Sequence, residues 1–167
     1  MTRDRQPYGS SRGRDIAGLA VFLALCLAVS AIGGAVTATS VGGWYQALHK
    51  PSFNPPDWIF APVWTALYLM MAVAGWLVWR GHGLRGARTA MTLFGAQLAL
   101  NLGWSILFFG FRSIGAALVE VVILLLAILA TTAAFWRRDR LAGMLFVPYA
   151  AWVAYATLLN AALWRLN

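Results

Sequence analysis

Charged side chains are scarce in this sequence, and acidic ones are scarcest of all. Only 11% of the 167 residues are charged, and only five are Asp or Glu, whereas a soluble domain carries roughly a quarter of charged residues. Because 61% of the residues are hydrophobic, the chain also lacks the polar composition of a disordered protein. The composition argues strongly against a water-soluble globule and favours a protein whose solvent is lipid.

Cysteine and histidine are nearly absent as well. The single Cys26 cannot form a disulfide within the chain or a CxxC motif. His49 and His82 are the only histidines, so the three side chains together offer too few ligands for a tightly held metal. We therefore predict no metal site and no obligatory cofactor.

Positive charge is what the chain has in excess. Its 13 Lys and Arg give a formal net charge of +8, which in a soluble chain would suggest a nucleic-acid partner. In a chain this apolar, the charge instead indicates loop arginines that orient a membrane protein. We therefore predict a lipid-embedded protein with no nucleic-acid partner.

Long apolar stretches define the fold class. Each is long enough to cross a hydrocarbon core of about 30 Å, and runs of this length are helical because barrel strands are short and alternate. The stretches are Ile16–Thr39, Trp58–Trp79, Ala87–Phe109, Ile114–Trp136 and Leu141–Leu163. We predict an all-α integral membrane protein, a five-transmembrane-helix bundle over residues 16–167.

The N-terminal residues 1–15 are polar and basic, and we expect them to be a disordered extension. A signal peptide cleaved after the first apolar run is the alternative, but the run is longer than a usual signal core.

Arginines distinguish the two sides of the membrane. The N-terminal segment and the second and fourth loops hold ten basic residues, whereas the other side holds Lys50, Arg112 and Arg165. The positive-inside rule predicts a cytoplasmic N-terminus in a multi-pass protein of the cell membrane.

The first loop, residues 44–58, contains three of the six prolines and four aromatic residues. Proline fixes φ, so this loop should be stiff and folded. Asp57 is positioned to cap the second span. Two interpretations remain open: an aromatic belt at the membrane interface, or a lid over a cavity between the helices.

The third span has two distinct faces. Its polar and aromatic side chains share one stripe, at Gln97, Asn101, Trp104 and Phe108, because residues spaced by three and four lie on one side of a helix. A row of small residues, Gly95, Ala99 and Gly103, lies on the opposite side. Small residues allow close helix packing, either against a second subunit or within the chain.

Polar and aromatic residues also occur inside the other spans. Trp64 and Tyr68 lie one turn apart in the second span, and the fifth carries a stripe of Tyr149, Trp152, Ala156 and Asn160. Such groups need partners because hydrocarbon supplies none. They predict either a cavity for a flat, apolar, aromatic ligand or simple hydrogen bonding between helices. Glu120 is the one acid well inside a span, and its role is either structural or that of a proton carrier.

These residues resemble a known family. The segment from Trp44 to Tyr68, with Lys50-Pro51-Ser52, Pro55-Pro56 and Pro62-Val63-Trp64, resembles the first loop and second helix of the TspO/MBR family, which comprises bacterial tryptophan-rich sensory proteins and mitochondrial translocator proteins. The segments Gln97…Asn101…Trp104…Phe108 and Pro148-Tyr149…Trp152…Asn160 resemble its third and fifth helices. The match runs in order through about 150 residues.

The resemblance implies a five-helix membrane bundle, usually a homodimer, that binds porphyrins such as protoporphyrin IX or haem and related flat hydrophobic ligands. By position, it implies these ligand-binding residues: Tyr45, Trp64, Tyr68, Gln97, Asn101, Trp104, Phe108, Trp152 and Ala156. It implies a lid loop held by Lys50, Pro51, Pro55 and Pro56, and a dimer face of Gly95, Ala99 and Gly103. Lys50 could also meet a porphyrin carboxylate.

The expected function is that of a membrane tetrapyrrole sensor or carrier that limits the accumulation of photoreactive porphyrin. An alternative follows from Trp64 and Trp152, which match tryptophans associated with light-dependent porphyrin degradation and would be the catalytic residues of such an enzyme. A third possibility is a proton-coupled exporter that uses Glu120.

Overall fold

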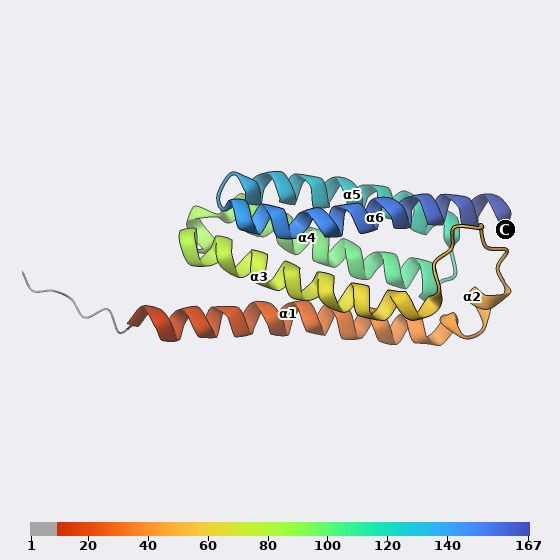
Figure 1. Cartoon of the computed structure of the whole chain (residues 1–167), viewed down its shortest axis with the longest axis horizontal. Coiled ribbons are helices and arrows are strands. Elements are labelled where there is room, and N and C mark those ends of the chain that lie inside the picture. The colour runs from red at the N-terminus through yellow and green to blue at the C-terminus, as the bar shows by residue number, and fades with distance from the viewer. Residues whose placement is uncertain (1–9) are drawn as a thin grey trace, which may run out of the picture.

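Five long helices run side by side along the molecule in the structure of this protein, a computed structural model that describes residues 10–167 (Figure 1). They are α1 (Ser10–Val41), α3 (Phe60–Gly86), α4 (Arg88–Ser105), α5 (Ile114–Trp136) and α6 (Arg140–Leu166). The described residues contain no strand. Each long helix, α4 together with its continuation, is long and apolar enough to cross a membrane, which confirms the predicted all-α membrane bundle.

The helix boundaries agree best with the predicted spans where the apolar run is uninterrupted. The fourth span lies at Ile114–Trp136, as predicted. Residues 10–15, which we expected to be disordered, instead form the first turns of α1. The reason lies in their contacts with α3, because the backbone oxygen of Asp15 accepts a hydrogen bond from the indole of Trp76. Residues 1–9 of the predicted extension lie outside the described residues.

Two short elements shape the first loop: α2 (Trp44–Ala47) and the 3₁₀ turn η1 (Asp57–Ile59). At the opposite end, α3 changes direction at Gly83, where φ is 65° and ψ is 174°. That conformation is unfavourable for any residue with a Cβ atom and is accessible to glycine. It lets the chain enter α4 after a very short connection.

The last part of the third span is not a regular α-helix. Helix α4 continues as the π-helical segment η2 (Ile106–Gly110), in which the amide of Phe111 donates to the carbonyl of Ile106, five residues earlier, at 2.8 Å. Such segments occur frequently at functional sites. Here the neighbouring residues Phe108 and Phe109 are both buried.

Aromatic packing fills one half of the bundle. In that half, Phe135 of α5 contacts Phe94 of α4 and Phe146 of α6, with ring centroids 5.9 and 5.1 Å apart. Helix α1 lies along one side of the bundle, mainly against α3, while α5 and α6 form the opposite side (Figure 1). The other half of the bundle, toward the first loop, contains a cavity.

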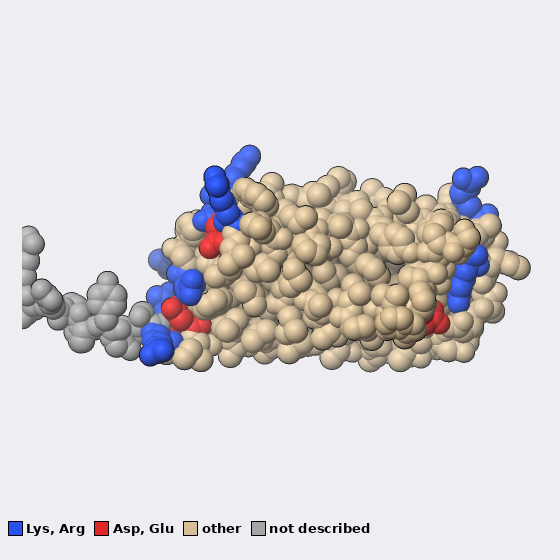
Figure 2. Space-filling model, viewed as in Figure 1, with Lys and Arg blue, Asp and Glu red and all other residues tan. Residues whose placement is uncertain are grey.

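Charged residues gather at the two ends of the molecule and leave a wide uncharged band between them (Figure 2). The helix ends that meet at one end carry eight described arginines: Arg12, Arg14, Arg80, Arg85, Arg88, Arg137, Arg138 and Arg140. The end that carries the first loop has Lys50, Arg112 and Arg165. This distribution is the one expected of a multi-pass membrane protein.

Candidate ligand-binding cavity

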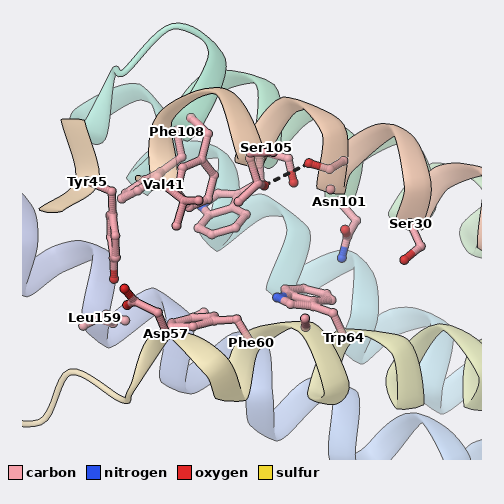
Figure 3. A pocket seen from close by; sticks show the side chains of 18 of the residues that line it. Ser30, Val41, Tyr45, Asp57, Phe60, Trp64, Asn101, Ser105, Phe108 and Leu159 are labelled. Atoms are coloured by element: carbon pink, nitrogen blue, oxygen red, sulfur yellow. Dashed lines mark hydrogen bonds between the residues drawn. The ribbon is translucent and has the colours of Figure 1, made fainter. Parts of the chain in front are cut away.

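The cavity has a volume of about 370 Å³ and lies between α1, α3, α4, η2 and α6, with α2 at its outer end (Figure 3). Its walls are mostly apolar, with a few polar groups, as is usual for small-molecule sites. The volume falls near the lower end of the range of roughly 300–1,000 Å³ for such sites. Because each wall comes from a different helix, the cavity exists only when the bundle is assembled.

Seven of the nine residues that the sequence predicted as ligand-binding line this cavity: Tyr45, Trp64, Tyr68, Asn101, Trp104, Phe108 and Ala156. Ring faces dominate the set. Trp104 stacks on Phe108, with centroids 5.3 Å apart and planes 26° apart, and Trp64 lies against Tyr68 at 5.9 Å. The cavity is therefore suited to a flat, apolar ligand.

The other two predicted ligand-binding residues, Gln97 and Trp152, do not line the cavity. Each lies one helical turn, about 6 Å, before a residue that does: Asn101 and Ala156. Gln97 is buried and bonded to Tyr149, whereas Trp152 packs against Phe60, with ring centroids 5.9 Å apart. Both residues therefore lie one turn deeper in the bundle than the cavity lining, and their role in ligand binding stays a prediction.

A chain of hydrogen bonds closes the inner end of the cavity. The hydroxyl of Tyr68 donates to Oδ1 of Asn101 at 2.6 Å, and Nδ2 of Asn101 donates to the hydroxyl of Tyr149 at 2.7 Å. Tyr149 in turn donates to Oε1 of Gln97 at 3.0 Å. All four side chains are buried, so both interpretations of the polar residues apply: they bond between helices, and two of them face the cavity.

A second polar pair joins α4 and α6 in the wall of the cavity. The indole of Trp104 donates to Oδ1 of Asn160 at 3.2 Å, and Nδ2 of Asn160 donates to the carbonyl of Ile114 at 2.9 Å. The orientation of the Asn160 amide is therefore determined by both contacts. This pair fixes the ring of Trp104 against the cavity.

Three polar side chains in the described part of the chain have buried atoms without a hydrogen-bond partner: Nε2 of Gln97, Nε1 of Trp152 and both carboxyl oxygens of Glu120. Glu120 does not line the cavity. It lies where α5 meets α4, and a Cβ atom at Gly103 would be 3.5 Å from its Oε1. The acid is thus separate from the predicted ligand site.

The first loop is folded and tied to α6. The hydroxyl of Tyr155 donates to the carbonyl of Phe53 at 2.6 Å. The side chain of Asn167 bonds to both the amide and the carbonyl of His49, at 2.9 and 3.1 Å. Within the loop, Tyr45 donates to Asn54 at 2.9 Å. These contacts hold α2 over the outer end of the cavity, as a lid would be held.

The predicted lid residues support this loop from outside the cavity. Pro51, Pro55 and Pro56 do not line the cavity. Lys50 lies with its ammonium 4.4 Å from the ring centroid of Tyr45 and donates to Oε1 of Gln46 at 2.9 Å. Lys50 is likewise absent from the cavity lining.

Asp57 has a different role from the helix cap that the sequence predicted. No side-chain hydrogen bond caps η1 or α3. The carboxylate instead accepts a hydrogen bond from Nε2 of Gln46 and lines the outer end of the cavity near Tyr45 (Figure 3). Burial, followed by the nearby charge of Asp57, raises the pKa of Tyr45 to about 12.

The cavity is open on one side. Its lining residues Gly34 and Ala38 of α1 and Ala61 and Thr65 of α3 are exposed at the surface. The opening thus lies between these two helices, within the uncharged band that lipid would cover. Their small side chains keep it open.

Sequence reasoning missed the contribution of α1 to the cavity wall. This helix supplies Ser30, Gly33, Gly34, Thr37, Ala38 and Val41. The signal was present, because small and hydroxyl residues recur there every three or four positions and share one face. Such a row in a long apolar run resembles ordinary helix packing, so it does not point to a cavity by itself.

The small-residue row of α4 is divided between two surroundings. Gly95 and Ala99 are exposed on the outer side of the bundle, opposite the buried Gln97 and Asn101, as predicted. Gly103 is partly covered by Glu120 of α5. The exposed part of the predicted dimer face therefore consists of Gly95 and Ala99.

Taken together, five membrane-spanning helices around an aromatic cavity define a multi-pass membrane protein with an internal cavity. The model of the TspO/MBR family matches residues 22–165 of the chain. This protein therefore belongs to the TspO/MBR family.

Individual relatives agree with this assignment. The chain is 43% identical over 155 residues to the tryptophan-rich protein TspO of Chlorobaculum tepidum, covering 92% of this chain and 98% of that one. It is 40% identical over 153 residues to the tryptophan-rich sensory protein of Cereibacter sphaeroides, with 92% and 93% covered. It is 43% identical over 126 residues to the translocator protein of Homo sapiens, with 74% and 75% covered.

Proposed function

We propose that this protein binds a tetrapyrrole, such as protoporphyrin IX or haem, and acts as a sensor or carrier that limits the accumulation of photoreactive porphyrin. The observation that carries the proposal is an aromatic cavity inside a membrane bundle, with the rings of Trp64, Trp104 and Phe108 in its wall. Stacking on such rings adds about 0.5–1.5 kcal/mol beyond the burial of apolar area. The family's sensory and translocator names agree with this role.

The chemistry of the wall indicates how the ligand is held. Among the described residues that line the cavity there is no Lys, Arg, His or Cys. The macrocycle is therefore held by contacts between its ring faces and the aromatic side chains of the wall, with its carboxylates directed to the opening or to the lid end. Metal-free porphyrin should bind about as tightly as haem, because the described lining has no His, Cys or Met and its two tyrosines, Tyr45 and Tyr68, donate their hydroxyls to Asn54 and Asn101.

A titration of the purified protein with protoporphyrin IX in the dark, followed by porphyrin absorbance, tests the proposal. Trp64→Leu should weaken binding about two- to tenfold, the equivalent of one lost stacking contact. Trp136→Leu is the matched control, because Trp136 is exposed at the far end of α5. Equal, non-saturating curves for all three proteins would mean that the porphyrin partitions into detergent, and would contradict the proposal.

Illumination of the same complex addresses the enzymatic alternative. Trp64 lines the cavity and Trp152 does not, so a photochemical role would fall first on Trp64. A light-dependent product that disappears in Trp64→Phe while binding persists would replace the carrier assignment with an enzymatic one.

We also propose a homodimer that meets through the exposed part of α4. Gly95 and Ala99 leave room there for a close approach between helices, and no Cβ contact within 4 Å would obstruct a side chain at Gly95. Ala99→Phe should therefore shift the protein from dimer to monomer in light scattering while leaving the fold intact. A monomeric wild type would contradict the proposal.

A further inference from the structure

A second hollow lies at the arginine-rich end of the bundle, away from the ligand cavity. It has a volume of about 330 Å³ and lies between α1 and α3. Arg14 and Asp15 line it from α1, and Trp79 and Arg80 line it from α3. Figure 2 shows the basic side chains gathered at this end, at the edge of the uncharged band.

Both arginines of this hollow lie over indole rings. The guanidinium carbon of Arg14 lies 5.3 Å from the ring centroid of Trp79, and that of Arg80 lies 4.4 Å from the ring centroid of Trp76. A guanidinium held flat on an aromatic face keeps its N–H edge free to donate hydrogen bonds. Stacking also restricts the side chain before any anion binds, which lowers the entropic cost of binding.

The two helices are tightly joined at this position. The indole of Trp76 donates to the backbone oxygen of Asp15 at 2.9 Å. A Cβ atom at Gly18 would overlap the ring of Trp79, so this indole can lie against α1 only because residue 18 is glycine. The arginines therefore project from a fixed base rather than from a loop.

The charge and position of the hollow indicate an anionic partner at the membrane surface. The lining contains two arginines and one acidic residue, Asp15, so the hollow keeps a net positive charge. The apolar side chain of Val21 is exposed two turns further along the same side of α1 as Arg14, where an acyl chain would lie. An anion that binds here would have its charged group in the hollow and its apolar part against α1.

We propose that this hollow binds the phosphate group of an anionic phospholipid. The guanidinium edges of Arg14 and Arg80 donate to the phosphate oxygens, while the indoles of Trp76 and Trp79 lie at the level of the headgroups, where tryptophan is enriched. Basic pockets between helices at the membrane surface are known to take such headgroups. Free inorganic phosphate offers the same oxygens but lacks the acyl chains.

The test compares lipids on the full-length, detergent-purified protein. Phosphatidylglycerol should bind as a resolved one-to-one adduct in native mass spectrometry and raise the melting temperature, whereas phosphatidylcholine should do neither. The double variant R14Q/R80Q should weaken phosphatidylglycerol binding at least tenfold. The variant R14K/R80K keeps the charge but loses the planar fork of the guanidinium. Its affinity for phosphatidylglycerol should lie between those of the wild type and R14Q/R80Q.

The matched control is R137Q/R140Q, which removes the same charge from exposed positions at the same end of the bundle. It should bind phosphatidylglycerol like the wild type. Equal losses in the two double variants would mean a diffuse charge effect and would overturn the proposal, as would unchanged binding in R14Q/R80Q. An equal thermal shift with millimolar inorganic phosphate would assign the site to free anions instead of lipid.

Discussion

Asn101 is the central residue of the hydrogen-bond chain at the inner end of the cavity. Its amide accepts from Tyr68 and donates to Tyr149, so one side chain joins α3, α4 and α6. Because the group is buried, removing it leaves two tyrosine hydroxyls short of a partner. A buried polar group without a partner costs about 1–3 kcal/mol.

Asn101→Leu should therefore lower the free energy of unfolding by about 1–3 kcal/mol and weaken porphyrin binding. Thermal unfolding in detergent measures the first effect, and titration measures the second. Tyr68→Phe should cost less, since Tyr149 keeps its partner on Asn101. The hydrogen-bond chain would have no energetic role if the Asn101 variant melted at the wild-type temperature.

Tyr45 makes the lid sensitive to alkaline pH. Its pKa of about 12 lies above the value of about 10 for an exposed tyrosine, so the folded lid favours the neutral phenol. The stability that Tyr45 contributes is complete below pH 10 and is lost as the pH rises through 12. Ionisation would also break its donated hydrogen bond to Asn54.

Ultraviolet titration of phenolate absorbance should thus show a step near pH 12 in the wild type that is missing in Tyr45→Phe. Ligand release should accelerate above pH 10 in the wild type and much less in the variant. Tyr155→Phe is a useful control, because it removes a different lid contact. Titration of Tyr45 near pH 10 would contradict the buried position described for it.

At the scale of single residues, the sequence predicted which side of a helix faces the cavity better than where along the helix the cavity ends. Helical spacing placed Asn101 and Ala156 on the correct sides of their helices, and both line the cavity. The same stripes include Gln97 and Trp152, which lie one turn deeper. Periodicity carries no information about where a cavity ends along a helix axis, because that limit depends on how neighbouring helices fill the space.

Among the elements, the π-helical η2 has the most direct effect on the cavity. A π segment corresponds to one extra residue in a helix, and here it accompanies the burial of two consecutive phenylalanines, Phe108 and Phe109. Phe108 lines the cavity in contact with Trp104. No apolar pattern distinguishes such a segment from a regular helix, so the sequence predicted an uninterrupted span there.

Deletion of Leu107 should remove the extra residue and restore a regular α-helical turn, so that Phe108 moves into the place of Leu107, about 100° around the helix. We expect the protein to stay folded and its affinity for protoporphyrin IX to fall at least tenfold, since Phe108 would leave the wall. Circular dichroism checks the fold, and the dark titration checks binding. If affinity were unchanged, the π segment would have no part in shaping the site.

For the whole molecule, the sequence was sufficient to predict a five-helix bundle, because each span is a continuous apolar run between charged loops. It was not sufficient to locate the cavity among the helices. The half around Phe94 and Phe135 and the half around Trp104 and Phe108 are both rich in aromatic residues. Only their packing in space decides which half is filled.

The uneven distribution of arginine at the two ends predicts the orientation of the protein in the membrane. The arginine-rich end should face the cytoplasm. A membrane-impermeant maleimide should label Ser52→Cys in intact cells and Arg137→Cys only after the cells are opened. Cys26 is buried and provides the unlabelled background. The reverse labelling pattern would contradict the predicted orientation.

The opening between α1 and α3 changes which concentration governs occupancy. Its small-residue rim at Gly34, Ala38, Ala61 and Thr65 faces the hydrocarbon, so a ligand dissolved in the bilayer reaches the cavity from a two-dimensional solution. Occupancy then follows the number of ligand molecules per lipid rather than per volume of water. At a fixed total amount of ligand, adding lipid should lower the occupancy of the site, because the ligand in the bilayer is diluted. The apparent affinity then becomes a property of the membrane as much as of the protein.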